Sequence, residues 1–580
     1  MVLVAALPLA IAHLNERAVP SPLIRFLVYP PEGSVANSIG RDAGPVAVSP
    51  DGRRLAFVAT SPDGTKRIFV RALDLPAAQG LAGTEGASYP FWSPDSQSLG
   101  FFADAKLKRI DVTGGPVQTL GDAPLGRGGT WNRDGVILFA PGPYDPLYRV
   151  SSSGGVAATV TTIDERAHEL SHRWPQFLPD GRHFLYLAFS TILGGPAAVH
   201  SLYVGSLDST RTQMLQRTTS RTTYVAPGYL LFVRDRVLFA EAFDAKQLTI
   251  TGEPFVLVEQ VQHYLNTAST VVSASDNGVL AYETASNPAV SELAWFDRTG
   301  RLIDRVPLPA GEYEDPRLSP KGDMIVMNRQ DSQTGISNIW LHGPSPSTLT
   351  RFTFEPSFDH YPNWSPDGAR IVFDSNRSGP ADIFVKPVAG GSEELLLPHS
   401  SQGKQPTDWS PDGRFIIYQQ LDPKTKWDLW MLPLSGDGKP EPVLHTDSNE
   451  MNGQLSPDGR WMAYASDELG RWEVYVTAFP HPSGKWQVSS GGGSQPRWRR
   501  DGREMFYLGA DRRLMAAEIR AGHDFSAGPA LPLFESHARY TGDMVYDVAP
   551  DGQRFLVNVA TSRAANPITI ELNWTAALKK

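Results

Sequence analysis

The sequence of 580 residues contains no cysteine, so disulfides and thiolate metal sites are excluded. It has no long run rich in lysine and arginine, and its formal charge is −9. A nucleic-acid partner requires a concentrated basic face, so we expect none. The sequence also has no run of about 20 apolar residues, the length that an α-helix needs to cross a bilayer.

Most catalytic motifs are missing as well. We find no Gly-x-Ser-x-Gly nucleophile elbow, no Walker-type phosphate loop and no protein-kinase signature. The segment from His168 to His172 fits the zincin pattern HExxH, which requires a helix that carries both imidazoles on one face. Pro175 follows within three residues and leaves no room for that helix. We interpret the match as a chance event in a loop, and we expect no enzyme activity, no cofactor and no metal.

What the sequence does contain is a repeated turn. Ser365-Pro366-Asp367-Gly368 has the residue order of a type I β-turn and lies between two apolar stretches, as in a β-hairpin. Copies or near copies recur at a spacing of roughly 40 to 50 residues, the period of a four-stranded propeller blade. They begin at Ser49, Ser93, Asn132, Leu178, Ser319, Ser410, Ser456, Arg499 and Ala549.

The repeat predicts an all-β fold of about twelve blades. Known rings usually hold four to eight blades, so we expect two tandem six-bladed β-propellers of four-stranded antiparallel blades. Ser286-Asn287-Pro288 is the expected boundary, which gives an N-terminal propeller at 21–287 and a C-terminal propeller at 288–580. Average composition, with 41% hydrophobic and 20% charged residues, agrees with a globular protein.

Each ring needs closure, because an open ring exposes a sheet edge. We expect the strand at 23–29 to complete the sixth blade of the first ring. By the same argument, the strand at 293–297 is expected to share the last blade of the second ring with the strand at 568–574. The apolar stretch at 2–14, within the segment 1–20, is interpreted either as the remnant of a membrane helix or as a terminus packed on the surface.

Two residue types recur in phase with the turn. Tryptophan precedes it in five copies, and aspartate occupies its third position in most. We expect the tryptophans to fill the wedges between blades, with carbohydrate stacking as the alternative. We expect each aspartate to cap its own turn, with calcium binding as the alternative. The tryptophans are Trp92, Trp131, Trp364, Trp409 and Trp498.

The repeat Pro-x-Trp-Ser-Pro-Asp-Gly, followed by Asp-Ile-Phe-Val at 382–385, resembles the TolB-type, WD40-like Pro-Asp propeller repeats. The stretches 229–234, 292–300 and 572–576 resemble the extracytoplasmic propeller region of bacterial receptor-type serine/threonine kinases, although the kinase domain is absent here. This second resemblance implies a sensor outside the cytoplasm, periplasmic or anchored to a membrane. A fold of this kind does not by itself fix the function.

The loops that enter the innermost strands ring one mouth of each channel, and polar residues there are the candidate ligand-binding residues. We expect them to bind a protein or peptide partner, or a small ligand. The alternatives are the propeller portion of a prolyl-oligopeptidase-like hydrolase and a TolB-like envelope adaptor. The candidates are Tyr89, His172, Arg173, Asp359, His360, Tyr361, Arg377, Lys404, Gln405, Asn449, Glu450 and Gln495.

Overall fold

The computed structural model describes residues 22–38, 43–61, 65–190, 200–264, 267–284, 291–331, 336–343, 348–377, 379–397, 402–422, 425–436, 438–522, 524–538, 544–560 and 567–579. The apolar segment 1–20 and the expected boundary at 286–288 lie outside these residues.

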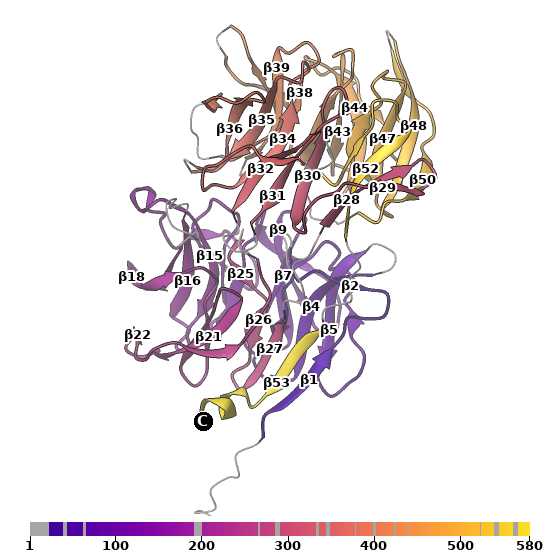
Figure 1. Cartoon of the computed structure of the whole chain (residues 1–580). Helices are drawn as coiled ribbons and strands as arrows, with labels where there is room; N and C mark the ends of the chain where they lie inside the picture. The colour runs from indigo at the N-terminus through magenta and orange to yellow at the C-terminus, as the bar shows by residue number, and fades with distance from the viewer. Residues whose placement is uncertain are drawn as a thin grey trace, which may run out of the picture.

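The described elements are β-strands, with short 3-10 turns at η1 (Glu165–Ala167) and η3 (Trp574–Lys579), so the all-β class is confirmed. In the part of the chain that the structure describes, no helix has the length and apolar character needed to span a bilayer. Within the described ranges, the strands form twelve antiparallel sheets of four or five strands and one pair, β24–β25. They gather into two bodies, one above the other in Figure 1.

The first ring contains six of these sheets. Its strands are β1 (Ile24–Val28), β2 (Val35–Ala36), β3 (Ala47–Val48), β4 (Arg54–Thr60), β5 (Lys66–Ala72), β6 (Gln79–Gly80), β7 (Ser88–Trp92), β8 (Ser98–Ala103), β9 (Lys106–Asp111), β10 (Gln118–Asp122), β11 (Gly129–Trp131), β12 (Val136–Phe139), β13 (Tyr148–Ser151), β14 (Ala158–Thr159), β15 (Glu169–Phe177), β16 (His183–Ser190), β17 (His200–Ser206), β18 (Ser209–Thr218), β19 (Thr223–Val225), β20 (Tyr229–Arg234), β21 (Val237–Asp244), β22 (Thr249–Ile250), β23 (Phe255–Val258), β24 (His263–Tyr264), β25 (Ser269–Thr270), β26 (Val272–Ala274), β27 (Val279–Glu283) and β53 (Ile568–Leu572).

The second ring contains the other six sheets. Its strands are β28 (Ser291–Asp297), β29 (Leu302–Arg305), β30 (Glu312–Leu318), β31 (Ile325–Gln330), β32 (Ser337–His342), β33 (Leu349–Arg351), β34 (Asp359–Trp364), β35 (Arg370–Ser375), β36 (Asp382–Pro387), β37 (Glu394–Leu395), β38 (Lys404–Trp409), β39 (Phe415–Asp422), β40 (Lys426–Pro433), β41 (Glu441–Leu444), β42 (Glu450–Leu455), β43 (Trp461–Ser466), β44 (Glu473–Ala478), β45 (Trp486–Gln487), β46 (Gly493–Trp498), β47 (Glu504–Gly509), β48 (Arg513–Ala521), β49 (Phe525–Ala527), β50 (Leu531–Glu535), β51 (Tyr546–Val548) and β52 (Arg554–Ala560).

The innermost strands close the second ring. Strand β30 contacts both β34 and β51, and β34, β38, β42, β46 and β51 contact one another in sequence. Between neighbouring blades, apolar side chains interdigitate: Trp364 packs with Val326 and Ile339 of the preceding blade. This packing confirms for Trp364 the prediction that the turn tryptophans fill the wedges between blades. The indole N–H of Trp364 also donates to the carbonyl of Arg317, at 3.2 Å.

The closure of the first ring differs from the expectation at one strand. The predicted strand at 23–29 does complete the blade of β27, as its edge strand β1. The prediction for residues 568–574 is wrong: β53 inserts between β27 and β1, whereas β28 pairs with β52. Figure 1 shows β53, in yellow, at the bottom of the first ring between β27 and β1, whose colours belong to earlier parts of the chain.

Packing explains why the last strand returns to the first ring. Ile568 and Ile570 are fully buried in one cluster with Val28 and Phe57. Trp574, at the start of η3, is buried in the next cluster with Val225. Burial of these three large apolar side chains contributes about 1.5 to 3 kcal/mol each, which stabilises the last strand in the first ring.

Candidate functional site

The innermost strands of several blades carry the same bulge. In β34 the register with β35 shifts between His360 and Asn363, and Tyr361 has a φ of 51°. The same left-handed backbone precedes a proline at Tyr89, Trp174 and Gln495. A residue before proline is normally extended, so the bulge is a strained feature that the surrounding blades hold in place.

The side chain two residues before each turn links neighbouring blades in the second ring. Arg317 Nε donates to Asn363 Oδ1 at 3.2 Å, and Asn363 Nδ2 donates to the carbonyl of Pro406 at 3.0 Å. The N–H of Leu318 donates to Asp547 Oδ2 at 2.7 Å, which closes the circle. We call these six side chains the girdle: Arg317, Asn363, Asp408, Gln454, Arg497 and Asp547.

The equivalent positions of the first ring carry no formal charge. They are Ala47, Phe91, Thr130, Gln176, Tyr224 and Ser273. They also join blades: the N–H of Val48 donates to Ser273 Oγ at 2.9 Å, and the N–H of Tyr224 donates to Gln176 Oε1 at 2.7 Å. The first ring therefore has a neutral girdle and the second ring a charged one with two arginines and two aspartates.

Three of the predicted mouth residues meet between the rings. Arg173 of the first ring, with His360 and Gln405 of the second, lines one cavity of about 120 Å³. The apolar part of the lining comes from both rings and includes Phe189 and Trp427. We call this space the junction cavity. Figure 1 shows the strands that supply it, β15 below and β34 and β38 above.

Tyr89 belongs to a second cavity inside the first ring. This cavity has a volume of about 180 Å³ and is lined by Tyr89, Trp174, Gln176 and Arg221 among others. The rings of Tyr89 and Trp174 meet edge to face with centroids 4.9 Å apart. The aromatic pair lies on the same innermost strands that bear the bulges, β7 and β15.

His172 is fully enclosed rather than exposed at the mouth. Its Nδ1 lies 2.7 Å from Thr161 Oγ1, and its Nε2 lies 3.1 Å from Glu169 Oε2. Both Glu169 and His172 belong to strand β15, so the HExxH pattern is not on a helix. Within the described residues no cluster of three or more potential metal ligands occurs.

The remaining second-ring candidates are buried in polar networks. Lys404 Nζ donates to Asp382 Oδ1 at 2.7 Å, and Asn449 Nδ2 donates to Asp467 Oδ2 at 2.6 Å. Gln495 Oε1 accepts the N–H of Val545 at 3.0 Å. Burial raises the pKa of Glu450 to about 7, although Thr446 donates a hydrogen bond to this carboxyl.

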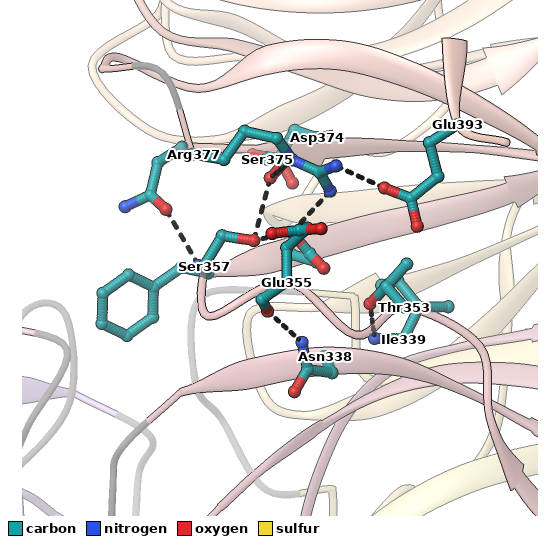
Figure 2. A network of polar contacts seen from close by, with 12 residues as sticks. Asn338, Ile339, Thr353, Glu355, Ser357, Asp374, Ser375, Arg377 and Glu393 are labelled. Atoms are coloured by element: carbon teal, nitrogen blue, oxygen red, sulfur yellow. Dashed lines mark hydrogen bonds and ion pairs between the residues drawn. The ribbon is translucent and has the colours of Figure 1, made fainter. Parts of the chain in front are cut away.

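Figure 2 shows the polar network around Ser357, Ser375 and Arg377, which also includes contacts of Asp359. Ser357 Oγ donates to Asp359 Oδ1 at 2.7 Å, and Arg377 Nε donates to Ser375 Oγ at 2.9 Å. Arg377 also forms an ion pair with Glu393. Burial raises the pKa of Asp359 in spite of these partners. The network ties the loop before β34 to the adjacent strand β35, because Ser375 Oγ also donates to Ser357 Oγ at 3.1 Å.

Sequence reasoning missed Arg127, Tyr144 and Trp427, which also line the junction cavity. They do not lie at the repeated position, so the period gives no signal for them. The girdle was missed too, although its signal was available: its members stand at one constant phase, two residues before the turn.

The turn aspartates cap their own turns, as predicted. Ser410 Oγ donates to Asp412 Oδ1 at 2.7 Å and accepts the N–H of Phe415 at 2.8 Å. Asp51, Asp95 and Asp458 form the same bond with their serines. These bonds favour the charged carboxylate, and the pKa of Asp95 is lowered chiefly by its bond from Ser93.

Comparison with known families gives a partial match. Residues 274–428 match the family model of the TolB beta propeller domain. The match begins in the last blade of the first ring and ends within the third blade of the second, at the start of β40.

Curated relatives match over short stretches. The chain is 26% identical over 125 residues to tricorn protease homolog 1 of Streptomyces coelicolor and 30% identical over 108 residues to the uncharacterized peptidase YuxL of Bacillus subtilis. These matches cover 22% and 18% of this chain, and only 11% and 16% of the two relatives. A third, an uncharacterized protein of Agrobacterium fabrum, is 29% identical over 209 residues, 34% of this chain and 68% of the relative.

Solved structures resemble the chain with low scores. The putative TolB from Agrobacterium tumefaciens has a TM-score of 0.38 at 18% identity and covers 48% of this chain and 100% of its own. The tricorn protease has a TM-score of 0.30 at 10% identity and covers 90% of this chain and 53% of its own. The fold assignment rests on the sheets described above.

Proposed function

We propose that this chain is a non-catalytic binding protein whose ligand occupies the junction cavity. The ligand is a peptide, a segment of a partner protein or a small molecule. The observation that supports this proposal is the convergence of Arg173, His360 and Gln405, from mouths of two separate rings, on one cavity. Ligand sites are concave, mostly apolar and frequent at domain interfaces, and this cavity has all three properties.

The polar groups around the cavity are preorganised. Arg173 is fixed by a bond from its Nε to Ser171 Oγ, at 2.7 Å, and its guanidinium lies 3.6 Å from the ring centre of Phe189. The N–H of His360 donates to Asp374 Oδ1 at 3.0 Å. Rigid donors lose little entropy when a ligand binds, which favours affinity.

The cellular context follows from the resemblance to receptor-type kinases. We propose an extracytoplasmic location and a role as the sensor part of a membrane kinase system. The TolB-like adaptor differs from this proposal mainly in its partner. Reading the genomic DNA on both sides of the coding segment tests the context, and an in-frame kinase and membrane helix upstream would support it.

A hydrolase is the second candidate function, and the peptidase names of two relatives favour it. In that case the chain is the propeller portion of a prolyl-oligopeptidase-like enzyme. A serine-reactive fluorophosphonate probe distinguishes the two functions. We expect no labelling of the purified chain, and stoichiometric labelling would support the hydrolase instead.

The binding proposal is tested by filling the cavity. Ala381 lines it and is 6% exposed, so Ala381→Trp places an indole in the space that a ligand would use. Wild type and variant are immobilised and exposed to a library of synthetic peptides and small metabolites, and retained compounds are identified by mass spectrometry. We expect compounds that wild type retains and Ala381→Trp loses.

The matched control is Leu395→Trp, on the outer strand β37 of the same blade, where the side chain is 45% exposed. It adds an indole to the surface and leaves the cavity unchanged. Cooperative thermal unfolding shows that each variant is folded. Retention of the same compounds by wild type and both variants would count against the junction cavity as the site.

A further inference from the structure

Two arginines at the junction cavity are buried and form no ion pair with a carboxylate among the described residues. Arg127 and Arg173 both line the cavity, and their exposed fractions are 3% and 4%. Arg127 Nη1 donates to the carbonyls of Leu125 and Gly126, at 3.2 and 3.0 Å. Arg173 Nη2 donates to the carbonyl of Pro143 at 3.1 Å. All these acceptors are neutral, and the carboxylate that lines the cavity, Asp374, accepts the backbone N–H of His360.

The charges also act on one another. The pKa of Arg173 is lowered to about 9, first by burial and then by the like charge of Arg127. Its other electrostatic neighbours are the hydroxyls of Tyr144 and Tyr89. On the far face of Phe189, His200 stacks at 4.1 Å, and burial together with the charge of Arg173 lowers its pKa to about 3. His200 is therefore neutral near pH 7, and the two guanidiniums supply positive charge to the first-ring wall of the cavity, whereas Asp374 is the carboxylate among the lining residues.

Donors remain free for a ligand. The Nε of Arg127 is buried and has no hydrogen-bond partner. Among the described residues, no bond engages Nη2 of Arg127 or Nη1 of Arg173. Burying a charged group without a counter-ion costs several kcal/mol, so such a pair is expected where a ligand supplies the negative charge.

We propose that the junction cavity binds a carboxylate that carries a small apolar group, held by Arg127 and Arg173. The planar guanidinium matches a carboxylate through paired N–H donors. The apolar part would lie against Phe189, Phe358 and Trp427. An apolar cavity of about 150 Å³ holds benzene. On this scale, the volume of about 120 Å³ here holds a group of about five carbon atoms. This inference rests on the proposed function and specifies its ligand class.

Two sources supply that chemistry: a free short branched acid and the C-terminus of a peptide that ends in valine. The probes are sodium isovalerate and the peptide acetyl-Gly-Gly-Val, each paired with its uncharged amide, isovaleramide or acetyl-Gly-Gly-Val-amide. Binding is measured by isothermal titration calorimetry at fixed ionic strength. We expect at least one acid to bind at least about tenfold more tightly than its amide, as charge-assisted bonds of about 1.5 to 3 kcal/mol imply.

The variants Arg127→Gln and Arg173→Gln are each expected to weaken binding of that acid at least about tenfold. The matched control is Arg221→Gln. Arg221 is a half-buried arginine whose pKa is lowered to about 10 by desolvation, but it lines the cavity inside the first ring instead. Binding to this control is expected to equal that of wild type.

The acid and amide comparison uses wild type alone, so it remains decisive if an arginine variant does not fold. Equal affinity for acid and amide, or absence of binding by both acids at millimolar concentration, overturns the carboxylate assignment. If compounds of another chemistry are still lost by Ala381→Trp, the proposed function stands and only this inference fails. Preference for the peptide acid identifies a C-terminus as the source, and preference for isovalerate identifies a free acid.

Discussion

At the scale of single residues, one position of the repeat decides the chemistry of each ring. The side chain two residues before the turn lies on the innermost strand, where it contacts the next blade. Ser273 fills that position in the first ring with a neutral hydroxyl, whereas Arg497 in the second ring lies 3.3 Å from Asp547 Oδ1. The same backbone therefore supports a neutral or a charged girdle.

Asp408 in the girdle makes the stability of the second ring depend on pH. Burial raises its pKa to about 7, although the N–H of Leu455 donates to its Oδ2 at 2.7 Å. In the unfolded chain an aspartate titrates near pH 4. Between about pH 4 and 7 the folded state therefore holds a proton that the unfolded state has lost, and the free energy of unfolding falls as pH rises.

We predict that Asp408→Asn removes part of this dependence. From pH 5.5 to 8 the wild type should lose at least about 1 kcal/mol more of its unfolding free energy than the variant. Urea unfolding at the two pH values measures this difference. The control is Asp367→Asn, because the pKa of this turn aspartate is lowered by its bond from Ser365 and its titration lies below the tested range. Identical pH slopes for wild type and Asp408→Asn would refute the prediction.

At the scale of elements, the hairpins rely on turn geometry rather than on one residue type. The serine and aspartate of the repeated turn bond to each other and to the backbone, which makes this turn readable from sequence. The tight turn between β8 and β9 is different. It consists of Asp104 and Ala105, both with positive φ, at 53° and 58°. Such a turn prefers asparagine and glycine.

We predict that Ala105→Gly stabilises the β8–β9 hairpin. A left-handed backbone costs a residue with a Cβ roughly 1 to 2 kcal/mol, and glycine avoids this cost at some expense of chain entropy. The expected gain in unfolding free energy is about 0.5 to 1 kcal/mol, measured by urea unfolding. Ala103→Gly, in the adjacent strand, is the control and should destabilise, because Ala103 is buried and has no positive φ. A loss of stability in both variants would show that Ala105 is not strained.

At the scale of the whole molecule, the chain passes between the two rings twice, once after β27 and once before β53. The chain leaves the first ring after β27, builds the second ring and returns as β53. Strand β53 is hydrogen-bonded on both sides, so the first ring is complete only when the end of the chain has been placed. The junction cavity lies between two bodies that are connected in this way.

We predict that Ile570→Ala loosens the first ring selectively. Ile570 is fully buried in β53, and its truncation should cost about 2 to 5 kcal/mol. Hydrogen exchange followed by mass spectrometry should show faster exchange in β1 and β27 and unchanged exchange in β28 and β52. Ile24→Ala in the edge strand β1 is the control, because Ile24 is 47% exposed. Faster exchange confined to the second ring would contradict the observed pairing.

The sequence by itself determined the local units: the Ser-x-Asp turns, the strands that flank them, the wedge tryptophans such as Trp364 and hence the all-β class. These features depend on residues close together in the chain, so the period displays them directly. Only the tertiary structure decided that Ile568 and Ile570 belong to the first ring, that candidates such as Glu450 are buried, and that Arg127 and Arg173 meet without a counter-ion. The physical reason is that strand pairing and burial depend on which distant surfaces complement one another. A sequence pattern predicts the strands and turns of a blade, but it does not predict which surface the blade will pack against.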